Sequence, residues 1–382
     1  MKTKTVCGQP SWRLANAGIE AFVTVQGGHL GPVTHRCGRR KVQPYSVAPW
    51  AEEPLGRDVI PLLKSLRGDF FCLPFGGNST PYRGERHPGH GQTASANWKF
   101  QSLETRNGRS GLHLRLDTTV RSGRVDKRVW IVEGHPVVYQ QHVIRGMRGP
   151  MSLGHHAMLK FPDEPGCGRI STSRFVRGQV LTEPFERPEN RGYSILKPGA
   201  VFKSLDRVPT VTGEWADLTR YPARRGYDDL AAIIADPEGS LAWTAVVFPG
   251  HGYAWFALKD PRVLRQTVFW ISNGGRHYPP WNGRHVNVLG LEEVTGWFHF
   301  GLAESARPNP WSKLGHPTCI PLAPDRPFVV NYLMATVPIP RGFDRVASIR
   351  PGAGRDSVAL KSASGKTVTV PVDVGCLTSG PR

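Results

Sequence analysis

Apolar and polar residues alternate with a period of two in many short stretches of the chain, and Gly, Pro, Asp or Asn residues bound most of them. Successive side chains of a strand point to opposite faces of a sheet, so this alternation predicts β-strands. The pattern indicates at least eleven strands, within residues 20–28, 112–123, 127–135, 137–146, 151–162, 229–239, 241–250, 253–260, 267–275, 287–301 and 328–338.

Helical periodicity is weak throughout the chain. Residues 58–66, "DVIPLLKSL", predict one short helix at most, and residues 307–317 read as a loop. So many strands with so little helix favour an all-β protein, a large antiparallel β-sandwich. We expect one sandwich domain over residues 1–340. Residues 341–382 predict a small C-terminal β extension, in which "SASGK" forms a turn between alternating strands.

The composition indicates a cellular compartment and argues against metal-binding and membrane proteins. Apolar residues make up 39% of the 382 positions, as in globular proteins. The six Cys are scattered, and none of their spacings suits zinc or a redox pair, so we expect no metal and a reducing compartment. The N-terminal segment lacks the apolar run of a signal peptide, and no stretch is long and apolar enough to span a bilayer. These features predict a cytoplasmic protein without a membrane partner.

The formal net charge is +19. A basic surface can bind nucleic acid or attract anionic substrates. No nucleic-acid-binding motif accompanies the charge, so we favour a solvated basic surface and expect no nucleic-acid partner.

The first candidate for chemistry is a long polar loop within residues 68–98 that follows the apolar run "FFCLPF". It carries Asn78, Arg83, Arg86, His87 and His90. Long polar loops on a β scaffold often hold binding residues. The alternative is an ordinary surface loop with exposed side chains.

The second candidate is the stretch "LGHHAMLKF" at residues 153–161. Alternation places His155 on the apolar face, with Leu153 and Ala157. It places His156 on the mixed face, two residues after Gly154, which would leave room for a ligand. We therefore expect His155 to be structural, while His156 is either a site residue or a second structural histidine.

The third candidate is the pair of carboxylates in "NVLGLEEVTGWF" at residues 287–298. Glu292 shares a face with Gly290, and Glu293 shares the other face with Leu291. A carboxylate within an apolar strand is costly unless something faces it. A ligand hydroxyl, a cation or one of the many Arg side chains would serve. Asp228 and Asp229, at the start of another strand, would either bind hydroxyl groups or form an ordinary turn.

Taken in order, these segments resemble the galactose mutarotase-like (aldose 1-epimerase) superfamily over about residues 12–340. The resemblance rests on "IEAFVTVQGGHLGPVTH", "FFCLPFGGN", "HGQTASANW", "LGHHAMLKF", "GYDDL" and "VLGLEEV". It implies a large twisted β-sandwich with a sugar in a concave cleft, and it requires no cofactor.

The resemblance also implies a reaction. A Glu removes the proton of the anomeric hydroxyl, a His protonates the ring oxygen, and the opened sugar recloses as the other anomer. Matched residue by residue, Glu292 falls on the base, with Glu293 as the fallback, and His156 falls on the acid. His90 falls on a substrate-contacting His, Asn78 on the Asn of the early loop, and Asp228 or Asp229 on a hydroxyl-binding Asp. We expect Glu292 and His156 to face one sugar from opposite sides.

Two positions depart from that family's pattern. Its early loop has Arg directly after Asn, whereas here Ser79 follows Asn78 and the nearest Arg are Arg83 and Arg86. Its acid His precedes an aromatic residue, whereas Ala157 follows His156. Arg83 and Arg86 would suit an anionic sugar, because guanidinium matches phosphate and carboxylate geometry. The sequence thus predicts an aldose 1-epimerase-like isomerase, with a non-catalytic carbohydrate-binding protein of the same fold as the alternative.

Overall fold

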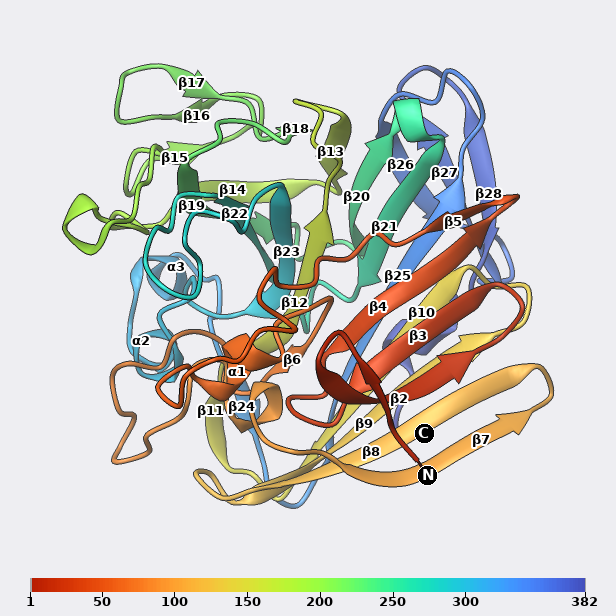
Figure 1. Cartoon of the computed structure of the whole chain (residues 1–382), viewed down its shortest axis with the longest axis horizontal. Coiled ribbons are helices and arrows are strands. Elements are labelled where there is room, and N and C mark those ends of the chain that lie inside the picture. Colours follow the sequence, from red (N-terminus) through yellow and green to blue (C-terminus); the bar gives the residue numbers. More distant parts are fainter. Residues whose placement is uncertain (1, 382) are drawn as a thin grey trace.

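A computed structural model describes residues 2–381 of the chain. Two large sheets dominate it (Figure 1). Every pairing between named strands of these sheets is antiparallel. The predicted all-β sandwich is confirmed, and each of the eleven predicted stretches contains a strand.

The nine-stranded sheet consists, in spatial order, of β18 (Arg220–Tyr221), β13 (Gly168–Thr172), β20 (Ala242–Phe248), β21 (Tyr253–Lys259), β25 (Phe328–Pro338), β10 (Val137–Arg145), β9 (Gly123–Val132), β8 (Arg109–Thr118) and β7 (Lys99–Arg106). The seven-stranded sheet consists of β15 (Val201–Phe202), β14 (Phe175–Val180), β19 (Tyr227–Ala235), β22 (Gln266–Asn273), β23 (Val288–Thr295), β12 (Leu153–Lys160) and β6 (Phe71–Cys72).

Smaller sheets complete the molecule. A five-stranded sheet contains β1 (Lys4–Val6), β2 (Gln9–Ala15), β3 (Ile19–Thr24), β4 (Leu30–Cys37) and β5 (Arg40–Val42). Two-stranded ribbons pair β11 (Gly149–Met151) with β24 (Ile320–Leu322), and β16 (Val208–Pro209) with β17 (Trp215–Ala216). The C-terminal segment forms a meander of β26 (Val346–Pro351), β27 (Ser357–Ser362) and β28 (Thr367–Pro371).

Three layers of apolar side chains follow from the alternation along the strands. The central core joins the facing sides of the two large sheets and includes Leu153, Ala157 and Leu291 of the seven-stranded sheet and Trp255 and Tyr332 of the nine-stranded sheet. The five-stranded sheet packs onto the same core through side chains such as Trp12 and Val33. A second core lies between the outer face of the nine-stranded sheet and the C-terminal meander, and a third covers the outer face of the seven-stranded sheet.

Helices are few and short. Helix α1 (Pro61–Lys64) lies within the stretch predicted to be helical, and α2 (Leu302–Ala306) follows β23. The prediction of a loop over residues 307–317 is wrong in part, because α3 (Pro310–Lys313) forms there. Pro310 suits the first helical turn, and the Asn309 side chain accepts hydrogen bonds from the Trp311 and Ser312 amides, which caps the helix. No helix of residues 2–381 has the length and apolar character needed to cross a membrane.

Candidate functional site

A cavity of about 230 Å³ opens on the outer face of the seven-stranded sheet. Strands β12, β19, β22 and β23 supply its floor, and the region of α1 and four loops supply its walls. The lining residues are Leu62, Leu63, Leu66, Phe70, His90, His156, Phe185, Glu186, Leu230, Trp270, Arg276, Trp281, Glu292 and His299. Pockets for drug-sized ligands span about 300 to 1,000 Å³, so this cavity suits a smaller ligand, on the scale of a single sugar ring.

His156 and Glu292 stand directly opposite each other on the adjacent strands β12 and β23. The Nε2 atom of His156 lies 3.2 Å from Oε1 of Glu292. The expectation that the two residues face one sugar from opposite sides is wrong, because their side chains lie next to each other on the floor of the cavity. The ring of Phe70 stacks on the imidazole of His156, with 4.5 Å between ring centroids. This stacking fixes the orientation of the imidazole.

Burial shifts both groups toward their neutral forms. It raises the pKa of Glu292 well above its ordinary value, and the Arg276 charge opposes that shift. Burial also lowers the pKa of His156 well below its ordinary value, and the neighbouring His90 lowers it further. The two groups therefore form a couple with one proton, and burial favours that proton on the Glu292 carboxyl beside a neutral His156 imidazole.

Arg276, from the loop between β22 and β23, is the charged centre of the cavity wall. Its Nε atom donates to Oε1 of Glu186 at 2.6 Å and lies 3.5 Å from Oδ2 of Asp228. Its guanidinium lies 4.4 Å from the centroid of the Trp281 ring and 4.8 Å from that of Phe185. Two carboxyl groups thus flank the single charge of Arg276, and aromatic rings lie beside it.

The neighbours of the two cavity residues, His155 on β12 and Glu293 on β23, point away from the cavity into the central core. His155 faces the central core, where its Nδ1 lies 2.8 Å from Oδ2 of Asp69. Glu293 also faces inward and is paired with Lys259 and with the hydroxyls of Thr244 and Thr267. Glu293 therefore cannot replace Glu292 at the cavity without disrupting a buried ion pair.

Gly154 and Gly290 serve different purposes. A Cβ atom at Gly154 would lie 2.5 Å from the carbonyl oxygen of Glu293, so this Gly permits close approach of β12 to β23. The expectation that it leaves room for a ligand is wrong. A Cβ atom at Gly290 would lie 3.1 Å from Oε1 of Glu292 and 3.0 Å from Cβ of Trp270, so Gly290 makes room for the Glu292 side chain.

The polar loop contributes only one of its predicted residues to the cavity. His90 lines the cavity, with its ring centroid 5.0 Å from that of His156. The Asn78 side chain is buried outside the cavity, where its amide donates to backbone carbonyls and its oxygen accepts from the Leu302 amide. Arg83 and Arg86 are exposed and do not line the cavity. These three residues therefore have no contact with a ligand placed in it.

The two aspartates of β19 also divide between faces. Asp228 lies beside Arg276, and it accepts hydrogen bonds from the Ser272 hydroxyl and the Asn273 and Gly275 amides. Asp228 does not line the cavity, so it orients Arg276, which does. Asp229 accepts from the amides of Ile195 and Leu196 and lines a separate cavity.

Several lining residues lie outside the motifs found in the sequence. Glu186 and Phe185 come from the loop after β14, Arg276 and Trp281 come from the loop between β22 and β23, and His299 follows β23. One signal was present, because residues 276–285 combine Arg, His, Tyr and Trp in a Gly- and Pro-rich loop. Trp270 Nε1 and His299 Nδ1 are buried without a hydrogen-bond partner among the described residues, and ligand hydroxyls would satisfy them.

Comparison with solved structures shows the same fold in proteins of low sequence identity. A galactose mutarotase-related enzyme from Lactobacillus acidophilus aligns with a TM-score of 0.53 and 13% identity over 85% of this chain and 97% of its own. A galactose mutarotase-like protein from Clostridium acetobutylicum aligns with a TM-score of 0.54 and 10% identity, over 88% of this chain and 98% of its own. A candidate aldose 1-epimerase from Escherichia coli K12 aligns with a TM-score of 0.56 and 15% identity, over 86% of this chain and 99% of its own.

The resemblance noted in the sequence is thus confirmed at the level of the fold, which is the galactose mutarotase-like β-sandwich. No protein-family model and no curated protein sequence matches the chain.

Proposed function

We propose that the chain binds a monosaccharide in the cavity above β12 and β23 and interconverts its anomers, as an aldose 1-epimerase does. The observation that carries the proposal is the His156–Glu292 couple, with 3.2 Å between Nε2 and Oε1 on the floor of a sugar-sized cavity. The shared fold supports it, since the proteins named above include a galactose mutarotase-related enzyme.

The side-by-side placement of the couple suits this reaction. The anomeric hydroxyl oxygen and the ring oxygen are both bonded to C1, so two groups in contact with each other can reach both oxygens. In the ionised form of the couple, Glu292 accepts the hydroxyl proton and His156 donates its proton to the ring oxygen. The bond between C1 and the ring oxygen breaks, C1 becomes an aldehyde, and rotation about C1–C2 precedes reclosure. The reverse proton transfers restore the couple.

A bound sugar and Arg276 both favour the ionised form of Glu292, although the Arg276 charge also lowers the pKa of His156. Sugar hydroxyls that donate to the Glu292 carboxylate stabilise its charge, and the Arg276 charge acts in the same direction. His90 and Glu186 are placed to bind hydroxyls, and the rings of Phe185, Trp270 and Trp281 offer apolar faces for the C–H groups of the ring.

The charge of the cavity favours a neutral sugar. Arg276 is the cationic side chain among the lining residues, and Glu186 and Asp228 already flank it. Arg83 and Arg86, on which an anionic substrate would depend, are exposed away from the cavity. We therefore place neutral aldoses ahead of sugar phosphates as substrates.

The test is an NMR measurement of anomer interconversion over a panel of neutral aldoses and sugar phosphates. We expect wild-type protein to accelerate interconversion for at least one neutral aldose. Glu292→Gln and His156→Asn should each lower kcat/KM by about 10²- to 10⁴-fold, the contribution of a general acid or base. Glu104→Gln, on exposed strand β7, is the matched control and should retain full activity.

Saturation-transfer NMR on the same samples separates binding from catalysis. Sugar binding that persists in Glu292→Gln supports the assigned role. Binding by wild type without acceleration would instead identify a non-catalytic carbohydrate-binding protein. Absence of both would overturn the proposed function.

A further inference from the structure

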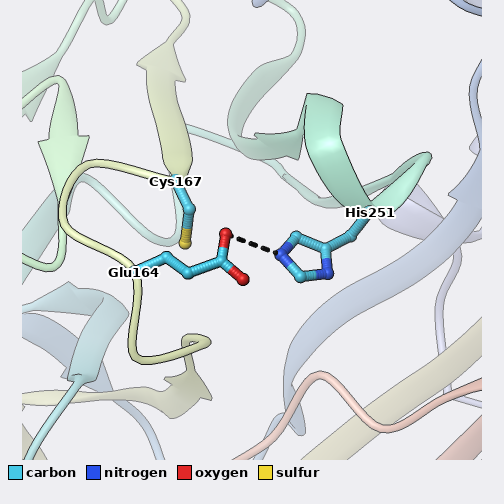
Figure 2. A group of neighbouring side chains, drawn as sticks. All are labelled: Glu164, Cys167 and His251. Carbon is cyan, nitrogen blue, oxygen red and sulfur yellow. Dashed lines mark ion pairs between the residues drawn. The ribbon is translucent and has the colours of Figure 1, made fainter.

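A second cluster of reactive side chains lies outside the cavity just described. Glu164 and Cys167 come from the loop that leads into β13, and His251 ends the turn η3 (Pro249–His251). One ligand atom from each residue lies within 4.8 Å of the other two. Figure 2 shows the carboxylate of Glu164 between the thiol of Cys167 and the imidazole of His251.

Strand pairing brings these residues together although His251 is remote in the sequence. Strands β13 and β20 are antiparallel neighbours, with Arg169 opposite Val247. Cys167 directly precedes β13, and η3 directly follows β20, so the two strand ends meet. A turn closed by the hydrogen bond from the Cys167 amide to the Glu164 carbonyl, 3.1 Å long, places both side chains on one side. The scattered Cys spacing in the sequence gives no sign of this cluster.

We propose that Glu164, Cys167 and His251 bind a zinc-class divalent cation. Thiolate, imidazole and carboxylate together form a ligand set that suits Zn²⁺ and does not suit Mg²⁺ or Ca²⁺. Two anionic ligands balance the charge of the ion. Glu164 is largely exposed, with 63% of its side chain accessible, so a fourth position is open to water.

The three ligand atoms, which lie within 4.8 Å of one another, must move closer together to bind the ion. Bonds of about 2.0 to 2.3 Å in a tetrahedral site place ligand atoms about 3.4 to 3.7 Å apart. Nε2 of His251 already lies 3.4 Å from Oε2 of Glu164. That nitrogen is shielded from solvent and has no hydrogen bond of acceptable geometry among the described residues. The guanidinium of Arg40 donates to the His251 carbonyl at 3.1 Å, which anchors the turn.

Bound metal would join the loop before β13 to the turn after β20. Pro165 and Gly166 of that loop also line the cavity of about 360 Å³ that contains Asp229. The ion would therefore fix one edge of this second cavity without contact with the His156–Glu292 couple.

Metal binding is tested with the purified protein, which carries no histidine tag. Equilibrium dialysis against Zn²⁺ should give one ion per chain. Dialysis against Co²⁺ should give a thiolate-to-cobalt charge-transfer band in the near ultraviolet. Cys167→Ser should abolish the band, while Cys319→Ser, at another half-buried cysteine, should retain it. His251→Asn and Glu164→Gln should each weaken zinc binding at least tenfold.

His251→Asn changes a partly exposed turn and keeps the test available if Cys167→Ser fails to fold. Absence of stoichiometric zinc in wild type would overturn the proposal and leave Glu164 and His251 as an ion pair. Equal binding by wild type and by the His251→Asn variant would overturn it as well, since the metal would then lie elsewhere.

Discussion

Neighbouring carboxylates in β23 show how one position along a strand decides the role of a side chain. Glu293 points inward, where Lys259 and two threonine hydroxyls compensate its charge. Glu292 points outward into the cavity, where its Oε1 lies 3.2 Å from Nε2 of His156. The first arrangement holds Glu293 in a buried ion pair, while the second leaves Glu292 facing the cavity, as the proposed proton transfer requires. Alternation in the sequence separated the two residues correctly.

The pH dependence of kcat/KM should follow the protonation state of the His156–Glu292 couple. We expect a bell-shaped profile, because the couple is active only with one proton and loses activity when it gains a second or releases the last. Burial lowers the pKa of His156 and raises that of Glu292. The acid limb should therefore lie below the imidazole value of about 6.5, and the alkaline limb well above the carboxyl value of about 4.3. Polarimetry over a pH series measures both, and an acid limb at the ordinary imidazole value would contradict the assignment.

At the scale of the strand, Gly154 sets the spacing between β12 and β23. Gly154→Ala would force a methyl group against the Glu293 carbonyl oxygen and the Val294 Cα. We expect a loss of about 1 to 3 kcal/mol in the free energy of unfolding, measured by urea denaturation, as for other overpacked sites. We also expect lower kcat/KM, since His156 would move relative to Glu292. Gly56→Ala is the control, because its Cβ would have no neighbour within 4 Å. Equal stability of the two variants would contradict this reading of Gly154.

Strands could be predicted from the sequence, and with them the floor of the cavity. The period of two assigned His155, His156, Glu292 and Glu293 to their faces without knowledge of the fold. The walls could not be predicted, because loops have no periodicity and their contacts depend on how the sheets stack. Arg276 meets Glu186 only after β14 and β22 are placed in one sheet with β19 between them. The alternation does not encode the order of the strands in the sheet. That order decides which loops meet at the cavity, and so it decides the contacts of Arg276 and Glu186.

At the scale of the molecule, the C-terminal meander covers one face of the nine-stranded sheet. Val358 and Leu360 of β27 are fully buried in the same core as Phe256 and Leu333. Leu360→Ala should therefore lower the free energy of unfolding by about 2 to 5 kcal/mol, as for other large-to-small core changes. Val176→Ala, at an exposed position, should change it by less than about 0.5 kcal/mol. Thermal denaturation compares the two, and a small effect of Leu360→Ala would mean that the meander packs loosely on the sandwich.

The pairing of His156 with Glu292 on strands β12 and β23 has a consequence for the evolution of such a protein. The groups proposed to move protons are fixed by backbone pairing of β12 and β23, two interior strands of the seven-stranded sheet. The groups that surround the ligand come mainly from loops, which tolerate substitution and insertion far better than paired strands do. Under the proposed function, reactivity would therefore depend on the paired strands and sugar selectivity on the loops. We would then expect loop substitutions to change the preferred sugar while the His156–Glu292 couple stays in place.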